Sequence, residues 1–146
     1  MVEFALVVVF IFLLFVSAVQ MILLMHAYNT LADAAKEGVR YAIVHGTQNA
    51  NCSGPNTSSV CTASNRDPAP YNNVQDTVVN FASVAFQNVT RGDVTVSYGP
   101  KTTTGSACND PGCSVRVVVH HTYSPLFGLG WPTFDLNAAA QGTIMN

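Results

Sequence analysis

Two adjacent histidines, His120 and His121, are the residues of this 146-residue sequence best suited to metal binding or acid–base chemistry. They lie in the segment Ser114–Tyr123 (SVRVVVHHTY), whose β-branched and alternating residues predict a strand. Neighbouring side chains on a strand point to opposite faces, so the two imidazoles are not expected to bind one ion. The acidic residues are dispersed, and no nucleophile in a Gly-flanked turn and no phosphate-binding Gly-rich loop is present in the sequence. We therefore expect no enzymatic activity, no metal and no cofactor.

The four cysteines form two local pairs, Cys52 with Cys61 and Cys108 with Cys113, each flanked by turn residues. Their even number, local spacing and loop context favour the disulfides Cys52–Cys61 and Cys108–Cys113, and therefore an oxidising compartment outside the cytoplasm. The alternatives are four free thiols, or one zinc site with ligands from distant loops. The sequence contains no CxxC motif, which weakens the zinc hypothesis.

The surface chemistry of the polar part of the chain excludes one large class of partner. The net charge is −2, and the six Lys and Arg residues are scattered. No basic stripe is available to neutralise a phosphate backbone, so we expect no nucleic-acid binding. Three N-x-S/T sequons begin at Asn51, Asn56 and Asn88 and are candidate glycosylation sites, although so Asn-rich a sequence produces such motifs by chance.

The stretch Phe4–Met25 (FALVVVFIFLLFVSAVQMILLM) dominates the organisation of the chain. It has no charge, and its length matches the roughly 20 apolar residues that cross a bilayer as a helix. Apolar side chains occur all round it, so it cannot face a core on one side and water on the other. Only lipid or a bundle of identical copies can cover it. No Lys or Arg precedes the run, which is longer than a signal-peptide core, so we expect that a basic leader preceded Met1 and was removed.

Glu3 stands alone at the head of this apolar run. An unpaired carboxylate in an apolar setting is energetically costly. One hypothesis is that Glu3 marks the interfacial end of a membrane helix, where a negative charge also suits the helix N-terminus. The other is that it pairs with a positive group, such as the N-terminal amine of a neighbour, and sets the register between subunits.

The helix is expected to continue as an amphipathic segment to His45-Gly46. One stripe is apolar and recurs every three or four residues: Tyr28, Leu31, Ala35, Val39 and Ala42. Asp33–Lys36 and Glu37–Arg40 are predicted exposed ion pairs on the polar side. Gly38 costs roughly 0.5–1 kcal/mol against alanine inside a helix, so we expect it at a close approach of another element, with Gly38→Leu disruptive and Gly38→Ala mild.

The rest of the sequence predicts a small α+β domain. Valine and phenylalanine at helical spacing predict a second helix over about Val74–Asn88, and Asp93–Tyr98, Ser114–Tyr123 and Thr133–Met145 predict three strands. We expect the helix to cover one face of a three-stranded antiparallel sheet. The predicted organisation is a long helix at 1–45 (apolar 4–25, amphipathic 26–45), a disulfide-bearing loop at 46–73 and a head domain at 74–146.

Two motifs resemble the TadE-like family. VEFALVVVFIFLLF (Val2–Phe15) is similar to the family's opening, in which a glutamate precedes a long apolar helix, and AAKEGVRYA (Ala34–Ala42) is similar to its AAREGARYA-type signature. VRVVVHHTYSPLF (Val115–Phe127), followed by an Ala-rich last strand, fits the family's usual C-terminal layout. The resemblance is strong over about Val2–Val44, looser after that, and absent from the Cys-containing loops.

The resemblance implies a protein related to type IV pilins and pseudopilins. Such a chain is inserted in the inner or cytoplasmic membrane, trimmed by a prepilin peptidase, and passed by the assembly machinery into an extracellular filament of identical copies. Glu3 would correspond to the pilin glutamate that pairs with a neighbour's N-terminus, here Met1. The family's glutamate lies slightly further from the cleaved end, so either Met1 is not the mature terminus or processing is unusual.

The leading hypothesis is therefore a structural filament subunit without catalysis. The alternatives are a membrane-anchored minor component that assists pilus assembly, and a single-pass anchor for an extracellular binding module. The residues expected to pack between helices are Phe4, Phe10, Leu14, Tyr28, Leu31, Gly38 and Val39.

Overall fold

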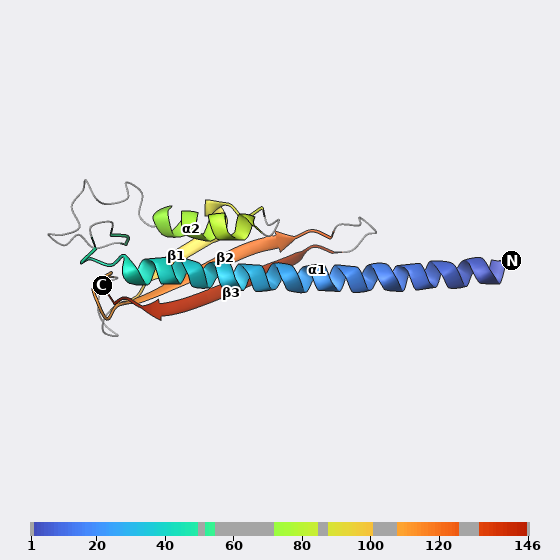
Figure 1. Cartoon of the computed structure of the whole chain (residues 1–146), viewed down its shortest axis with the longest axis horizontal. Helices are drawn as coiled ribbons and strands as arrows, with labels where there is room; N and C mark the ends of the chain where they lie inside the picture. The colour runs from blue at the N-terminus through green and yellow to red at the C-terminus, as the bar shows by residue number, and fades with distance from the viewer. Residues whose placement is uncertain are drawn as a thin grey trace.

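The computed structural model describes residues 2–49, 52–54, 72–84, 88–100, 108–125 and 132–145. It consists of one long helix and a small head built from a second helix and a sheet (Figure 1). The elements in chain order are α1 (Val2–Val44), α2 (Asn72–Ser83), the short 3-10 helix η1 (Arg91–Asp93), β1 (Val94–Tyr98), β2 (Ser114–Tyr123) and β3 (Phe134–Thr143). The predicted α+β fold, with a long apolar N-terminal helix and a three-stranded antiparallel sheet, is confirmed.

Helix α1 is continuous over 43 residues, which corresponds to about 65 Å at 1.5 Å per residue. No proline interrupts it, and its first turn carries the acidic residue Glu3, which suits the positive end of the helix dipole. The N-terminal part of α1 projects from the head, whereas its C-terminal part lies alongside α2 and the sheet (Figure 1). The N-terminal part of this helix is therefore exposed, whereas its C-terminal part is packed in the head.

The sheet has the strand order β1-β2-β3, and both neighbouring pairs are antiparallel. The central strand β2 pairs Val117 with Val96 of β1 and with Ala140 of β3. Inward-facing residues alternate with exposed ones along β1, as the period of two requires. Both α1 and α2 pack on the face that carries Val96 and Val117. The opposite face is not covered by any described residue.

Small and β-branched side chains fill the interface between the two helices and the sheet. Fully buried members include Leu31 and Ala35 of α1, Val78 of α2, and the β2 residues Val117 and Val119. Alanine recurs on the buried stripe of α1 because a helix can lie close to a sheet only where its side chains are short. The core of the head is therefore shared between α1 and the elements that follow it.

The ends of several elements differ from the sequence-based expectation. Helix α2 begins at Asn72 and ends at Ser83, so the helix predicted to reach Asn88 was too long; Asn88 lies outside the helices and strands. Strand β1 begins one residue after Asp93, because Asp93 closes η1. The predicted third strand, Thr133–Met145, is shorter at both ends, whereas Ser114–Tyr123 matches β2.

Candidate functional site

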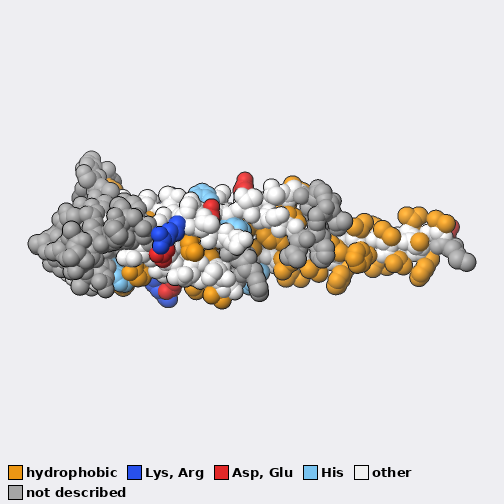
Figure 2. Space-filling model, turned by 90° about the horizontal axis from the view of Figure 1, so that it is seen from above, with side chains coloured by type: hydrophobic (Ala, Val, Ile, Leu, Met, Phe, Trp, Pro, Cys, Tyr) orange, Lys and Arg blue, Asp and Glu red, His pale blue; other side chains and the backbone are white. Residues whose placement is uncertain are grey.

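The projecting part of α1 is the largest exposed apolar surface of the described chain. All residues from Phe4 to Phe15 are exposed, and the large apolar ones among them expose between 46% and 76% of their surface. Figure 2 shows hydrophobic side chains around this end of the molecule. Helix α1 is also the one helix among the described residues that is long and apolar enough to cross a membrane. A surface of this size and continuity needs a partner phase or a partner protein.

Glu3 lies in the first turn of α1 and is exposed in the single chain. None of the ion pairs found among the described residues includes it. Its predicted partner position, Met1, lies outside the described residues, so the subunit-register role of both residues stays a prediction. A group that neutralises Glu3 within an apolar bundle must therefore come from another molecule or from residues outside the described ranges.

The head begins to cover α1 at Val16, which is 5% exposed. One turn later, Gln20 is also 5% exposed although it carries an amide. The Tyr123 hydroxyl at the end of β2 donates a hydrogen bond of 3.2 Å to Gln20 Oε1, which joins residues 103 positions apart. This hydrogen bond fixes where the β2–β3 end of the head meets the helix, because a buried amide oxygen needs a hydrogen-bond donor within reach.

The residues expected to pack between helices divide into two groups. Leu31, Gly38 and Val39 are buried, and they pack against the chain's own head. Tyr28, on the predicted apolar stripe, is 49% exposed in the single chain, whereas its neighbour Ala27 is 1% exposed, so the packing of Tyr28 between helices stays a prediction. The remaining members, Phe4, Phe10 and Leu14, are exposed on the projecting part.

Gly38 lies where α1 passes closest to α2 and the sheet. A Cβ atom at this position would overlap Val78 Cγ2 and would lie 3.4 Å from Val117 Cγ1. Gly142 of β3 has a similar position, since its Cβ would lie 2.6 Å from Ile43 Cδ1 of α1. The two glycines therefore allow α1 to approach α2 and the edge strand closely.

The charges of α1 lie on the side that faces away from the head. Lys36 Nζ lies 2.9 Å from Asp33 Oδ1, and Arg40 Nη1 lies 3.3 Å from Glu37 Oε2, so both predicted pairs are present. All four side chains are substantially exposed, so these pairs contribute only a few tenths of a kcal/mol each. They mark the part of the helix surface that stays in water.

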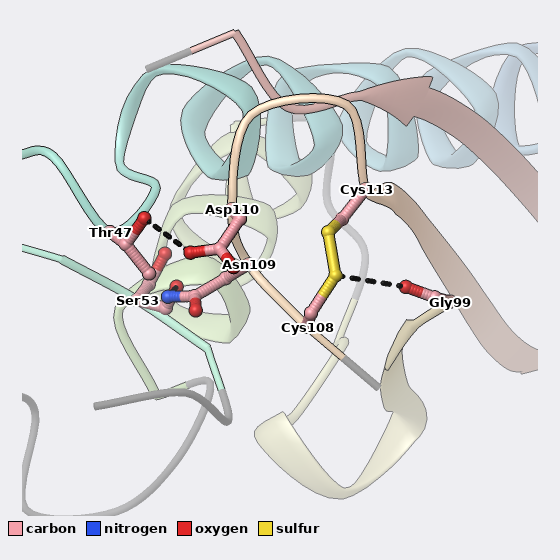
Figure 3. The surroundings of a disulfide bond; sticks show 7 residues. All are labelled: Thr47, Ser53, Gly99, Cys108, Asn109, Asp110 and Cys113. Carbon is pink, nitrogen blue, oxygen red and sulfur yellow. Dashed lines mark hydrogen bonds between the residues drawn. A yellow bond between two sulfur atoms is a disulfide. The ribbon is translucent and has the colours of Figure 1, made fainter. Parts of the chain in front are cut away.

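The C-terminal end of α1 is held by a disulfide-bearing turn (Figure 3). Cys108 and Cys113 are bonded and close the turn before β2. Within it, the Asn109 carbonyl accepts a hydrogen bond of 3.1 Å from the Thr47 backbone N–H, and Asp110 Oδ1 accepts one of 2.8 Å from the Thr47 hydroxyl. Asn109 itself is fully buried and donates to the Ser53 carbonyl. The turn therefore ties the segment after α1 to the start of β2.

The second predicted bridge is only partly visible. Cys52 is in a disulfide and is fully buried. Its predicted partner, Cys61, lies outside the described residues, so the Cys52–Cys61 pairing stays a prediction. The sequons at Asn51 and Asn56 also lie outside them. Asn88 is exposed and lies outside the helices and strands.

The histidine pair lies beside Asp93 near the end of the sheet. His120 Nδ1 and Asn137 Oδ1 form a cross-strand hydrogen bond on the uncovered face, and His121 is only partly exposed. The Asp93 carboxylate accepts hydrogen bonds from the Thr90 backbone N–H and hydroxyl, both 2.8 Å. The pKa of Asp93 is lowered, mainly by the hydrogen bond from the Thr90 backbone. Partial burial raises it, whereas the Thr90 hydroxyl and the two histidines lower it further. In the described part of the chain, no group of three or more His, Cys, Asp or Glu side chains could hold a metal ion.

Some of these positions were not found from the sequence. Gln20 was visible as a polar interruption of the apolar run, but its partner Tyr123 could not be identified across 103 residues. Gly142 and Asn109 gave no local signal, because their importance depends on which distant residues they contact. A polar residue inside an otherwise apolar helix was the one usable clue.

Comparison with known families supports the assignment of the N-terminal part of the chain. The family model described as TadE-like protein matches residues 1–40. The resemblance predicted from the sequence is therefore confirmed over this region, which contains the projecting part of α1 and most of its buried stripe. No curated protein and no solved structure matches the chain.

Proposed function

We propose that this chain, whose first 40 residues match the TadE-like family, is a structural pilin-like subunit that polymerises through its N-terminal helix into an extracellular pilus filament. The observation that carries the proposal is the division of α1. Its first part, Phe4–Phe15, is uncharged and exposed on all sides, whereas its second part is built into the core of the head. Identical helices would form the filament core, and the heads would cover it.

The exposed surface is too unfavourable in water to be the final state. Of the twelve residues from Phe4 to Phe15, eleven are large and apolar, all except Ala5. Each of them exposes between 46% and 76% of its surface. At about 1.5–3 kcal/mol for full burial of each side chain, covering the exposed part stabilises the protein by on the order of 10–20 kcal/mol, as an upper bound. Lipid supplies this cover before assembly, and neighbouring helices supply it in the filament.

The place where the head meets α1 favours a filament over a simple anchor. From Val16 onward the head covers one side of α1, so the apolar stretch that is exposed on every side is Phe4–Phe15, and its twelve residues correspond to about 18 Å of helix. The hydrocarbon core of a bilayer is about 30 Å thick. With Glu3 at one membrane surface, the β2–β3 end of the head would have to enter the acyl region, a position that a filament subunit occupies only until assembly but an anchor keeps permanently. A bundle of parallel helices has no fixed apolar thickness, so it does not force the head into an apolar layer.

Glu3 has a specific role under this proposal. Within a bundle it is surrounded by apolar helices, so its carboxylate requires a positive partner, for which the N-terminal amine of a neighbouring copy is the candidate. Other partners implied by the resemblance are the membrane before assembly, a prepilin peptidase and the pilus assembly machinery. The proposed location is the cell surface, after passage through the inner or cytoplasmic membrane, and no catalytic activity or cofactor is involved.

The test is the distribution of the native protein between membrane and sheared surface material. Filaments removed by shearing are imaged by electron microscopy, and the chain is identified in them by mass spectrometry and immunogold labelling. A shaft subunit dominates the sheared fraction and labels filaments along their length. Labelling only at filament ends would favour the minor-component hypothesis, and retention of the whole pool in the membrane would favour the anchor.

A further inference from the structure

An apolar groove lies where the β2–β3 end of the head overhangs α1. It consists of two hollows: one of about 230 Å³ against Gln20 and Met21 under Tyr123 and Phe134, and one of about 370 Å³ between Met25 and Leu136. Leu24 lines both hollows, so they are adjacent, and we call the pair the overhang groove. None of the described residues that line it carries a charge.

The chemistry of the overhang groove restricts its occupant. A charged segment would be desolvated there without a counter-charge, so the occupant must be uncharged over its whole contact. It must also be elongated, because the groove follows α1 from Ser17 to Asn29. The segment Phe4–Phe15 of this chain has both properties, since it is an uncharged rod with apolar side chains on every face.

The spacing of the two hollows suits a helix. The α1 residues that line them are centred about six positions apart, which corresponds to about 9 Å along the axis. On a facing helix, side chains seven positions apart lie on the same side and about 10.5 Å apart, as Phe4 and Ile11 do. Two bulky side chains of one helix can therefore enter the two hollows together, in the manner of ridges packing into grooves.

We propose that the overhang groove receives the Phe4–Phe15 helix of a second copy of this chain. The inference rests on the proposed filament, and it identifies which surface of a neighbouring copy covers the projecting helix. The groove is centred near residue 23 or 24 of α1 and the segment Phe4–Phe15 near residue 9 or 10, so parallel copies in contact are offset by about 21 Å along the axis. Each copy would present its helix to one neighbour and its groove to another.

Site-specific photo-crosslinking in assembled filaments tests this contact. The photoreactive residue p-benzoylphenylalanine replaces Leu136 in one full-length variant and Phe134 in a second. The matched control replaces Ala139, which is exposed on the opposite face of the same strand. After irradiation, the Leu136 probe is expected to give at least tenfold more product of twice the monomer mass than the Ala139 probe, with the adduct within residues 4–15. The probe lies against Met25 and Tyr28, so its own Phe4–Phe12 is at least about 20 Å away and an adduct there joins two copies.

The outcomes separate this inference from the filament proposal. If filaments form and both groove probes give adducts only outside residues 4–15, or only with lipid, the overhang groove is not the seat of the neighbouring helix, while the filament stands. If the unsubstituted protein forms no filaments, both proposals fail. Loss of filaments with both groove probes, but not with the Ala139 probe, supports the groove as an assembly surface.

Discussion

An alanine at Gly38 is expected to destabilise the protein, although alanine is the better helix former. The added Cβ would overlap Val78 Cγ2 and crowd Val117 Cγ1. Val78 and Val117 are both fully buried, and a β-branched side chain has few rotamers to move into. The sequence predicted a close approach at Gly38 but not its distance, and the expected effect of Gly38→Ala was therefore mild. The structure revises it, because the space at Gly38 is already occupied.

The magnitude follows from two opposing effects. Replacing glycine by alanine in a helix interior stabilises by roughly 0.5–1 kcal/mol. Inserting a methyl group into a packed core costs about 1–3 kcal/mol. We therefore expect a net destabilisation of about 1 kcal/mol, and of at most about 2.5 kcal/mol. Gly38→Leu adds three more carbon atoms at the same place and is expected to prevent folding of the head.

A double-mutant cycle identifies the cause. Val78→Ala removes the methyl group that the new Cβ meets, so Gly38→Ala should be less harmful in that background, with a coupling energy of at least about 0.5 kcal/mol. The measurement is urea unfolding of the full chain in detergent, followed by near-UV circular dichroism. Gly92→Ala is the control, since its Cβ would meet only Thr90 Oγ1, at 3.7 Å. A Gly38→Ala protein as stable as the wild type, or more stable, would refute the reasoning.

Four further outcomes are expected. Glu3→Gln should leave membrane insertion and head folding intact but abolish surface filaments, because breaking a buried pair costs about 3–5 kcal/mol at every contact; blots of membrane and sheared fractions measure this, and filaments of normal length and number would contradict it. The lowered pKa of Asp93 contributes stability above the unfolded-state pKa of about 3.9, and this contribution is lost as the pH falls through the lower folded-state pKa. Asp93→Asn should therefore flatten the dependence of the urea midpoint on pH below about 4, and an unchanged profile would exclude this role. Tyr123→Phe should lower the free energy of unfolding by about 0.5–1.5 kcal/mol, whereas the control Tyr28→Phe, at an exposed position, should have no effect. Reduction of the Cys108–Cys113 disulfide, whose cysteines are 5 positions apart, should cost about 2 kcal/mol on the chain-entropy model, and intact mass before and after alkylation shows whether the bond is present in native protein.

The elements of the fold could be predicted where a local pattern decides them. Strand β2 was found with its correct ends because its alternation is bounded by Gly112-Cys113 before it and Pro125 after it. Helix α1 was found because apolar residues and i,i+3 ion pairs continue without a proline from Val2 to Val44. The end of α2 was not found, because valine spacing continued beyond the residue at which the helix stops.

The site was only partly predictable, since its key contacts join distant residues. The exposed apolar segment and Glu3 are properties of the first fifteen residues and were visible in the sequence. The overhang groove depends on Phe134 and Leu136 meeting α1 more than a hundred positions earlier. The level of Tyr28 illustrates the same point, because the head packs against the adjacent Ala27 and leaves the tyrosine at the rim of the groove.

The continuity of α1 has a consequence for how a polymer of this chain would be organised. Because the second half of the helix is part of the head's core, the head cannot turn or slide on the projecting half without disrupting the packing at Leu31, Gly38 and Val39. The hydrogen bond between Gln20 and Tyr123 fixes the overhanging end of the head in the same way. The projecting helix and the overhang groove are therefore held at one separation along a single rigid rod. A contact between the helix of one copy and the groove of the next would then define one axial step, and its repetition gives an open helical polymer rather than a closed ring, because the offset along the axis cannot return to zero.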